Sequence, residues 1–359
     1  MGMDYDVAIV GGGMAGFTIA AQLPVGLKVC LLESEGDFGY HSTGRSAALF
    51  STTYGPADIR RMSRASKAFF DAPPPGFCEV PLVRDRGAMM VAAPGEEDAL
   101  AGLAAEIGLD EENYLVDPDQ AASISPWLRA DRIVGALFES QAKDIDVDAL
   151  FQGYRRKAKA NGVELRSNWE LPAARQEESG WRVEVAGADK SLSDELTARV
   201  LVNAAGAWGD VVAKRCGVEP VGLVPKRRSA GMVKVGPDGP SMQTPMLIGL
   251  GDDWYMKPEG QQMLVSPSDA TPVEPHDAYA DDFALAQAVD RAQHLTRLEV
   301  RRFERTWGGL RTFAPEANPA KGWADGVPGF YWSVGQGGYG IQTAPAWGAE
   351  AAAEISAWF

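Results

Sequence analysis

An apolar stretch that runs straight into a glycine-rich turn near the N-terminus constrains this chain more than any other feature. Residues 5–10 (YDVAIV) have the composition of a short buried strand, and Gly11, Gly13 and Gly16 follow in the pattern G-x-G-x-x-G. The first glycine of this pattern permits a tight turn, and the second lets the backbone approach a pyrophosphate. The third lets a helix pack on the strand. The turn therefore predicts a phosphate-binding site at the start of a helix.

The residues after the turn complete a βαβ unit. A helical pattern runs over 14–23, and an apolar strand pattern over 27–32 ends at Glu33. The interval from Gly11 to Glu33 is close to the spacing of about 20 residues at which an acid binds a ribose 2′-hydroxyl. We therefore predict a bound dinucleotide with no 2′-phosphate.

Three further segments favour FAD over NAD. Residues 41–48 (HSTGRSAA) place hydroxyls and a cation after the second strand, where they can bind phosphate oxygens. Residues 203–208 (NAAGAW) turn a strand end into a helix through small residues. Residues 335–342 (GQGGYGIQ) lead into a helix whose start would stabilise an anionic reduced flavin. An ordinary NAD dehydrogenase needs none of the three, although three unrelated glycine turns are the alternative interpretation.

Composition excludes several other classes of protein. The net charge of −15 argues against nucleic acid and anionic lipid as partners. Three cysteines and three histidines, widely spaced, favour neither a disulfide framework nor a metal site. No stretch approaches the roughly 20 apolar residues that span a bilayer. We therefore expect a cytoplasmic protein without a metal or a transmembrane segment.

The order of the patterns predicts an α/β fold with two domains. Nucleotide-binding patterns occur at both ends of the chain and enclose a block of antiparallel strand patterns. We expect a discontinuous Rossmann-type (glutathione-reductase-like) FAD domain over 1–75, 141–215 and 306–359. An α+β substrate domain built on an antiparallel sheet would comprise 76–140 and 216–305.

Motifs along nearly the whole chain resemble the D-amino-acid oxidase superfamily of flavoproteins, which includes glycine oxidase and sarcosine oxidase. The resemblance is strongest to the bacterial D-arginine dehydrogenases. It rests on GYHSTGRSAA (39–48), AFFDAPPPGFCE (68–79), LVNAAGAW (201–208), PKRRSA (225–230), WYMKP (254–258), TWGGLR (306–311) and QGGYGIQT (336–343). It implies non-covalent FAD and hydride transfer from substrate Cα to flavin N5. The released imino acid would hydrolyse to a 2-oxo acid and ammonia.

The same resemblance assigns the substrate-binding side chains. Arg311 would bind the substrate carboxylate, since a guanidinium offers two parallel charge-assisted hydrogen bonds. Arg228 would lie nearby, and Tyr255 would donate a hydrogen bond to the carboxylate. Tyr54, on a mobile loop, would close over the substrate and exclude water. The alternatives are a structural ion pair for Arg311, a solvated charge on a strand for Arg228, and buried aromatics without a role for the two tyrosines.

At the reactive edge of the flavin, Gly338 would offer its carbonyl to the substrate amine, and Gln342 opens the last helix. The sequence shows no clear general base, so solvent would take the amine proton. The full set of predicted cofactor-binding residues is Gly11, Gly13, Ala15, Gly16, Glu33, Ser34, Ser42, Thr43, Arg45, Ser46, Ala47, Ala48, Leu171, Ala205, Gly206, Trp208, Gly309, Arg311, Gly337, Gly338, Tyr339, Gly340, Ile341 and Gln342.

Two positions depart from the D-arginine dehydrogenase pattern. Leu49 replaces a histidine near the substrate amine, and Ala88 replaces the acid that pairs with a cationic substrate side chain. Because an unpaired buried guanidinium is costly, arginine and lysine should be poor substrates, unless Asp85 restores the acid. The predicted substrate pocket comprises Leu49, Ser51, Ala88, Met246 and Ile248.

The leading hypothesis is therefore an FAD enzyme that oxidises a neutral or apolar D-amino acid and passes the electrons to a quinone, a dye or oxygen. An FAD oxidase for glycine or N-methyl amino acids is the nearest alternative. A flavin-binding sensor or assembly factor is an alternative of another class. The sequence leaves the oligomeric state open.

Overall fold

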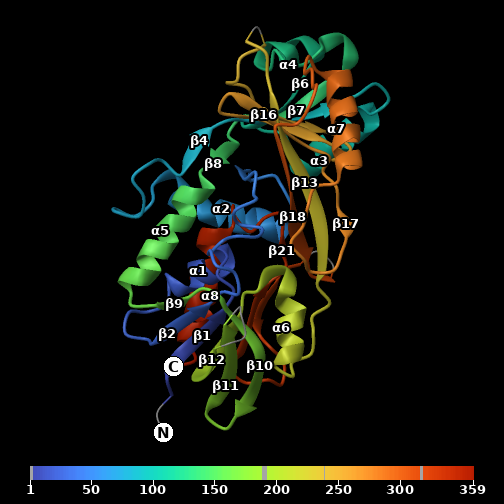
Figure 1. Ribbon diagram of the computed structural model, residues 1–359. Helices are drawn as coiled ribbons and strands as arrows, with labels where there is room; N and C mark the ends of the chain where they lie inside the picture. Colours follow the sequence, from blue (N-terminus) through green and yellow to red (C-terminus); the bar gives the residue numbers. More distant parts are fainter. Residues whose placement is uncertain (1–2, 188–191, 238, 316–317) are drawn as a thin grey trace.

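The computed structural model describes residues 3–187, 192–237, 239–315 and 318–359. It is elongated, with one sheet toward each end and helices between and around them (Figure 1). Strands β13 (Val224–Lys234) and β18 (Arg305–Phe313) run from the upper part of the view toward its centre, and so bring the upper sheet close to the lower one.

The lower sheet is eight-stranded and has a parallel centre. β1 (Tyr5–Val10) pairs with β2 (Val29–Leu32) on one side and β12 (Ser193–Asn203) on the other. β20 (Phe330–Val334) extends the parallel set beyond β12, and β9 (Glu164–Arg166) extends it beyond β2. The antiparallel members are β10 (Trp169–Glu177), β11 (Gly180–Gly187) and β19 (Ala320–Trp323).

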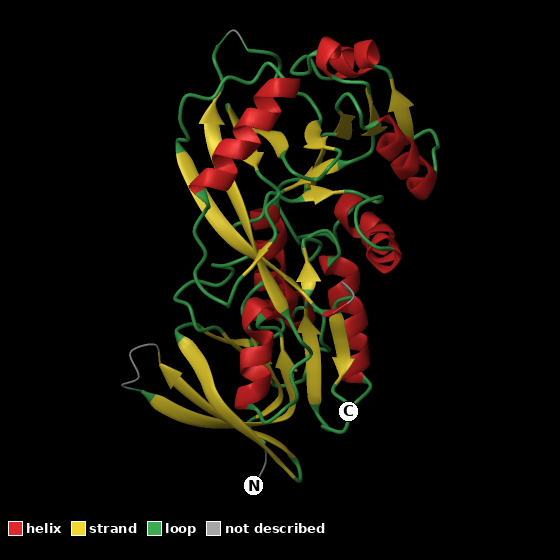
Figure 2. Ribbon diagram, turned by 90° about the vertical axis from the view of Figure 1, so that its right-hand side faces the viewer, coloured by secondary structure: helices red, strands yellow, loops and turns green. Residues whose placement is uncertain are grey.

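Helices cover both faces of this sheet, as Figures 1 and 2 show. On one face α1 (Met14–Ala20), α5 (Val147–Ala160) and α8 (Ala344–Ser356) bury alternate side chains of β1, β2 and β12. α6 (Gly209–Arg215) packs with the opposite set of side chains. α5 begins where the Asp146 carboxylate accepts a hydrogen bond from the Ala149 amide, a standard N-cap. Both faces of the parallel strands are buried, as expected for an α/β fold.

The upper sheet is ten-stranded and antiparallel, except that β14 runs parallel to β5. Its order is β21 (Gln336–Gly337), β18, β13, β16 (Gln262–Ser266), β15 (Tyr255–Glu259), β14 (Met246–Gly249), β5 (Ala88–Ala92), β7 (Gly135–Glu139) and β6 (Asn113–Val116), with β17 (Thr271–Pro272) on β13. One face packs beneath α4 (Pro118–Ile124) and α7 (Asp282–Leu295). The other face carries Arg228, Tyr255 and Met246.

Shorter elements join the two sheets. β3 (Leu49–Phe50), β8 (Lys143–Ile145) and β4 (Val83–Asp85) form a third, small sheet, with α2 (Ala57–Asp71) following β3 along the chain. The remaining elements are α3 (Glu97–Ile107), η1 (Ala130–Arg132) and η2 (Gly206–Trp208). No helix in the described part of the chain is long and apolar enough to cross a membrane.

The predicted fold class is confirmed: a Rossmann-type domain with a parallel centre lies beside a sheet that is mainly antiparallel. The boundaries of some elements differ. The first helix ends at Ala20 rather than near residue 23, and the last begins at Ala344. β18 lies in the ten-stranded sheet although its residues fall almost wholly in the stretch 306–359, which we assigned to the FAD domain. The division into two domains stays a prediction.

Candidate active site

The glycine turn after β1 leaves no space for side chains at two of its positions. Gly11 has a φ of +112°, and a Cβ there would lie 2.3 Å from the carbonyl oxygen of Ala204. A Cβ at Gly16 would lie 2.0 Å from the carbonyl oxygen of Gly11, because α1 crosses closely over the turn. Gly16 therefore acts by packing behind the turn, and it does not line the cavity described below.

Glu33 braces the same turn from the end of β2. Its carboxylate accepts hydrogen bonds from the Gly12 amide at 2.8 Å and the Glu35 amide at 2.9 Å. Thr43 reaches the turn from the other side, where its Oγ1 accepts a hydrogen bond from the Met14 amide at 3.0 Å. The N-cap residue of α1, Gly13, offers no side-chain cap, and the first turn of the helix has no acid. This arrangement suits a phosphate at the helix start and places an acid where a ribose would lie.

A single cavity runs from this turn to the ten-stranded sheet. Most of the predicted cofactor-binding residues line it: Gly11, Gly13, Ala15, Glu33, Ser34, Ser42, Thr43, Arg45, Ser46, Ala47, Leu171, Ala205, Gly206, Trp208, Gly309, Arg311, Gly337, Gly338, Gly340 and Ile341. Besides Gly16, three predicted residues lie outside its wall: Ala48, Tyr339 and Gln342. Ala48 packs against the hydrophobic core around α1, α5 and α8. The Tyr339 ring meets that of Tyr54 edge to face, and Gln342 forms hydrogen bonds with Ser51 and Ser63.

Other residues of the cavity wall were not predicted from the sequence. Those with large polar or aromatic side chains include Tyr40, His41, Trp169, Arg215 and Trp307. The His41 ring lies 4.5 Å from that of Trp208, and its Nε2 is 2.8 Å from a Glu35 carboxylate oxygen. Tyr40, His41 and Trp307 stand inside motifs that we had matched, so their position beside glycines was the available signal.

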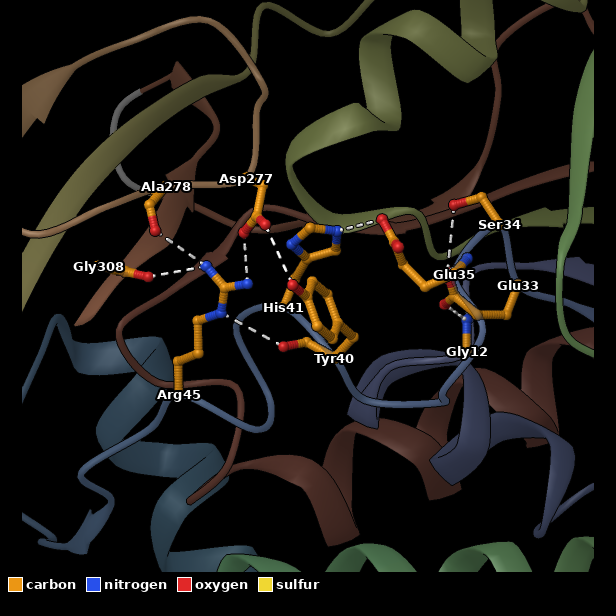
Figure 3. A network of polar contacts seen from close by, with 10 residues as sticks. All are labelled: Gly12, Glu33, Ser34, Glu35, Tyr40, His41, Arg45, Asp277, Ala278 and Gly308. Atoms are coloured by element: carbon orange, nitrogen blue, oxygen red, sulfur yellow. Dashed lines mark hydrogen bonds and ion pairs between the residues drawn. The ribbon is translucent and has the colours of Figure 1, made fainter. Parts of the chain in front are cut away.

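Arg45 ties the loop after β2 to the substrate side of the molecule (Figure 3). Its guanidinium donates to the carbonyl oxygens of Ala278 at 3.0 Å and Gly308 at 2.9 Å, and to the Asp277 carboxylate at 2.5 Å. The Tyr40 hydroxyl donates to the same carboxylate at 3.1 Å, and this bond raises the pKa of Tyr40. Arg45 lines the cavity while its charge is satisfied by protein acceptors, and its binding of the cofactor stays a prediction.

Two arginines meet at the opposite end of the cavity. Arg228 on β13 and Arg311 on β18 come from neighbouring strands of the upper sheet, and both line the cavity. The Tyr54 hydroxyl lies 3.2 Å from Nη1 of Arg311. Gly338 allows close approach, since a Cβ there would lie 2.8 Å from the same nitrogen. Tyr255, buried on β15, also faces this end.

These guanidiniums differ from their neighbour Arg227. Arg227 points to the other side of β13 and pairs with Asp269 at 3.2 Å and Asp281 at 2.6 Å. Among the described residues no carboxylate lies within ion-pair distance of Arg228 or Arg311, and Nε of Arg228 has no hydrogen-bond partner at all. Two half-buried cations without protein anions can bind an anionic ligand.

Burial acts most strongly on both guanidiniums and opposes their charge. Burial and then repulsion from Arg311 hold the pKa of Arg228 below its ordinary value. At Arg311 the attraction of the Tyr54 and Tyr255 hydroxyls outweighs burial, and the pKa lies above its ordinary value. Both side chains stay cationic at neutral pH because the ordinary pKa of arginine is above about 12. Burial raises the pKa of Tyr339 to about 12, so it is a neutral neighbour.

None of the five residues predicted for the substrate pocket lines this cavity. Leu49, Met246 and Ile248 pack in one apolar cluster with Tyr255, which does line it. Ala88 pairs with Met246 in the sheet, and Ser51 is turned toward Glu139 instead of the cavity. Asp85 cannot restore the missing acid, since its side chain is 94% exposed and lies near Lys143.

The cavity fits FAD. Its glycine turn and Glu33 suit an adenosine diphosphate, and the wall continues through Ala205 and Gly309 to Gly338, leaving room for a second ring system beside the arginines. The described residues contain no group of three or more His, Cys, Asp or Glu side chains that could hold a metal ion.

Family comparison agrees with this geometry. The model for the family described as "FAD dependent oxidoreductase" matches residues 6–354, so the chain belongs to this family. Membership of the superfamily expected from the motifs is thereby confirmed, and FAD is its cofactor. The particular likeness to D-arginine dehydrogenases stays a prediction.

Individual relatives are distant. α-Glycerophosphate oxidase from Enterococcus casseliflavus is 26% identical over 58% of this chain, which spans only 36% of that protein. Glycine oxidase from Geobacillus kaustophilus is 23% identical, with 95% of this chain and 90% of that protein covered. Its crystal structure superposes with a TM-score of 0.83 at 21% identity over 99% of this chain and 95% of that one.

A structure of L-α-glycerophosphate oxidase from Mycoplasma pneumoniae with FAD bound gives a TM-score of 0.84 at 18% identity, over 99% of this chain and 95% of that one. At these identities the superpositions show the shared fold. The substrate is a separate question, which the side chains of this chain must answer.

Proposed function

We propose that this protein is an FAD-dependent enzyme that oxidises the Cα–N bond of a small α-amino acid of the glycine or N-methylglycine type. The observation that carries the proposal is the pair of half-buried arginines, Arg228 and Arg311, that face the cavity without protein carboxylates. A substrate carboxylate would neutralise them through charge-assisted hydrogen bonds. Glycine oxidase, which aligns with 95% of this chain over 90% of its own length, supports this substrate class.

FAD, when bound, accepts the hydride from the substrate carbon. The residues of the chain bind and orient the substrate. Arg311 and Arg228 would fix the carboxylate, with Tyr54 and Tyr255 completing the clamp, and the Gly338 carbonyl would accept a hydrogen bond from the amine. The nitrogen lone pair forms the C=N bond as the hydride leaves, so the amine must already have lost a proton to solvent. Water then hydrolyses the imino acid.

A neutral D-amino acid is the second candidate, and the apolar cluster that reaches the cavity wall at Tyr255 favours it. Leu49, Met246 and Ile248 pack against Tyr255, which lines the cavity. No acid stands at Ala88 and Asp85 faces solvent, so a cationic side chain would lack a partner. Leucine or phenylalanine of the D configuration would bury apolar surface on this wall.

A sensor or assembly factor needs no carboxylate clamp, and the two unpaired arginines therefore argue against that class. Phosphate is the other anion that suits paired arginines. Since relatives named for glycerophosphate exist, glycerol 3-phosphate is the necessary comparison substrate. We further propose a cytoplasmic location and reoxidation by oxygen or a quinone.

The proposal is tested by anaerobic reduction of the protein-bound flavin, which is measured as the loss of its visible absorbance. The panel is glycine, N-methylglycine, the D and L forms of leucine, phenylalanine and arginine, and glycerol 3-phosphate. Reduction by glycine or N-methylglycine supports the main proposal, and reduction by D-leucine or D-phenylalanine alone supports the second candidate. Reduction by glycerol 3-phosphate alone, or by D-arginine in preference to all others, would overturn both.

A further inference from the structure

One buried acid close to the site has no place in the proposed chemistry. Glu139, the last residue of β7, is 4% exposed. No lysine, arginine or histidine among the described residues pairs with it. Its carboxylate instead accepts hydrogen bonds from the Ser51 hydroxyl at 2.6 Å, the Thr53 hydroxyl at 2.8 Å and the Thr52 amide at 2.9 Å. All three donors belong to one loop, so the acid serves that loop.

The loop in question carries Tyr54 to the active site. Ser51 Oγ accepts a hydrogen bond from the Tyr54 amide at 3.1 Å, so the hydroxyl that Glu139 holds also shapes the turn before Tyr54. The Ser51 amide in turn donates to Gln342 Oε1 at 3.3 Å, at the entry to α8. From this base the Tyr54 hydroxyl reaches Arg311 at 3.2 Å.

We infer that Glu139 is a positioning residue, which fixes the Ser51–Thr53 turn and thereby sets Tyr54 against Arg311. It does not line the cavity, so it touches neither substrate nor cofactor and acts only through the loop. The inference rests on the proposed function, because a well-placed Tyr54 matters only if Arg311 binds a substrate carboxylate. It also identifies the bonds that must break if the loop moves.

The chemistry of the three donors requires a carboxylate at this position. Ser51 Oγ already accepts bonds from the backbone, so its proton must go to an acceptor, and the Thr52 amide can only donate. Glutamate offers acceptors alone, whereas glutamine has one acceptor and one donor group. In either orientation of its amide, Glu139→Gln leaves at least one loop donor unsatisfied while it keeps the shape of the side chain.

A double-mutant cycle tests the inference. We expect Tyr54→Phe and Glu139→Gln each to raise the KM for the best amino acid about tenfold, since one hydrogen bond to a charged group is lost in each. The limiting rate should change by less than about threefold, because such bonds hold substrate and transition state alike. The double variant should be no worse than Tyr54→Phe alone, since both changes act on one contact.

Hydrogen exchange supplies a readout that needs no substrate. The amides of Thr52, Thr53 and Tyr54 should exchange faster in Glu139→Gln than in the wild type. Leu137→Ala is the matched control, since Leu137 is buried two residues earlier on the same strand and contacts a different cluster. It should lower stability without a change in these amides or in KM.

These measurements test the proposed function and the role of Glu139 separately. A wild type that oxidises no amino acid defeats the proposed function, while the exchange rates still decide the role of Glu139. Unchanged exchange in Glu139→Gln, or KM effects that multiply in the double variant, would overturn the inference. If Glu139→Gln does not fold, Thr53→Val replaces it, with Thr53→Ser as the control that keeps the hydroxyl. Thr53→Val should raise KM about threefold and Thr53→Ser should not, because only the former loses the bond to Glu139.

Discussion

The two ends of the cavity are built in different ways. The nucleotide end is made largely of backbone from one continuous βαβ unit, in which Gly11, Gly16 and Glu33 lie within a short stretch of chain. The substrate end is made of side chains, with Tyr54, Arg228, Tyr255 and Arg311 contributed by four separate segments, three of them strands of the upper sheet.

Because the two ends differ in this way, cofactor binding should depend on the backbone of one end and substrate turnover on the side chains of the other. Backbone geometry at the nucleotide end is common to any chain that binds a dinucleotide in this way, so it identifies the cofactor but not the reaction. Charge distinguishes the substrate end, because two half-buried arginines there have no protein carboxylate to pair with. Substitutions should therefore affect cofactor binding and turnover separately.

The largest effect on turnover without an effect on cofactor binding is expected at Arg311. Replacing it by methionine (Arg311→Met) keeps the length of the side chain and removes the charge that binds the carboxylate. We expect kcat/KM for the amino acid to fall about 1,000-fold, which corresponds to about 4 kcal/mol and lies within the usual cost of losing one partner of a buried charge pair. The bound flavin should stay in stoichiometric amount, as measured by its absorbance.

Arg227→Met is the matched control, since this neighbouring arginine pairs with Asp269 and Asp281 and faces away from the cavity. It should affect stability more than kcat/KM. A kcat/KM for Arg311→Met within about tenfold of the wild type would mean that the substrate anion binds elsewhere, since even one neutral hydrogen bond contributes about that much.

At Glu33 we expect the opposite result, an effect on cofactor binding without an effect on turnover. Glu33→Gln keeps the shape of the side chain but loses an acceptor for the Gly12 amide or for a ribose hydroxyl. We expect the dissociation constant for FAD to rise about tenfold, the usual effect of one charged hydrogen bond. At saturating FAD, kcat and KM for the amino acid should equal the wild-type values. Titration of the apoprotein with FAD measures the first, and steady-state kinetics measures the second.

The same division explains what could be predicted from the sequence. The spacing of the glycines and of Glu33 is local, so it predicted a dinucleotide and the first βαβ unit, while the choice of FAD needed three further segments at 41–48, 203–208 and 335–342. Arg228 and Arg311 were found through motifs, because no pattern along the chain shows that β13 and β18 are neighbours. Arg227 and Arg228 are adjacent and identical in type. Side chains alternate between the two faces of a strand, and for this reason Arg227 forms ion pairs whereas Arg228 faces the cavity.

Contacts made by single side chains between remote segments could not be predicted. Glu139 ends an ordinary apolar strand pattern, and its donors lie some 86–88 residues earlier. Asp277 is 232 residues from Arg45 and stands in a loop with no motif. Such pairs depend on how the two sheets are docked, which no local pattern records.

The smallest expected effect concerns Asp277, which joins the two regions through Arg45 (Figure 3). The hydrogen bond from Arg45 holds the pKa of the Asp277 carboxyl below its ordinary value. Its contribution is therefore complete above about pH 4, the ordinary value for aspartate, and is lost as the pH falls through the lower folded-state pKa. Asp277→Asn removes this contribution at every pH.

At pH 7 we expect Asp277→Asn to release FAD about two- to threefold faster than the wild type, a small effect because the carboxylate is partly exposed and screened by salt. The difference should shrink only as the pH falls through the lowered folded-state pKa of Asp277, where the wild-type carboxylate also becomes neutral. Flavin fluorescence on release measures the rate, and Asp131→Asn, on an exposed pair with Arg132, is the control. A difference that grows toward acid pH would show that Asp277 holds the loop through its shape and not through its charge, and the two ends of the cavity would then be joined by packing alone.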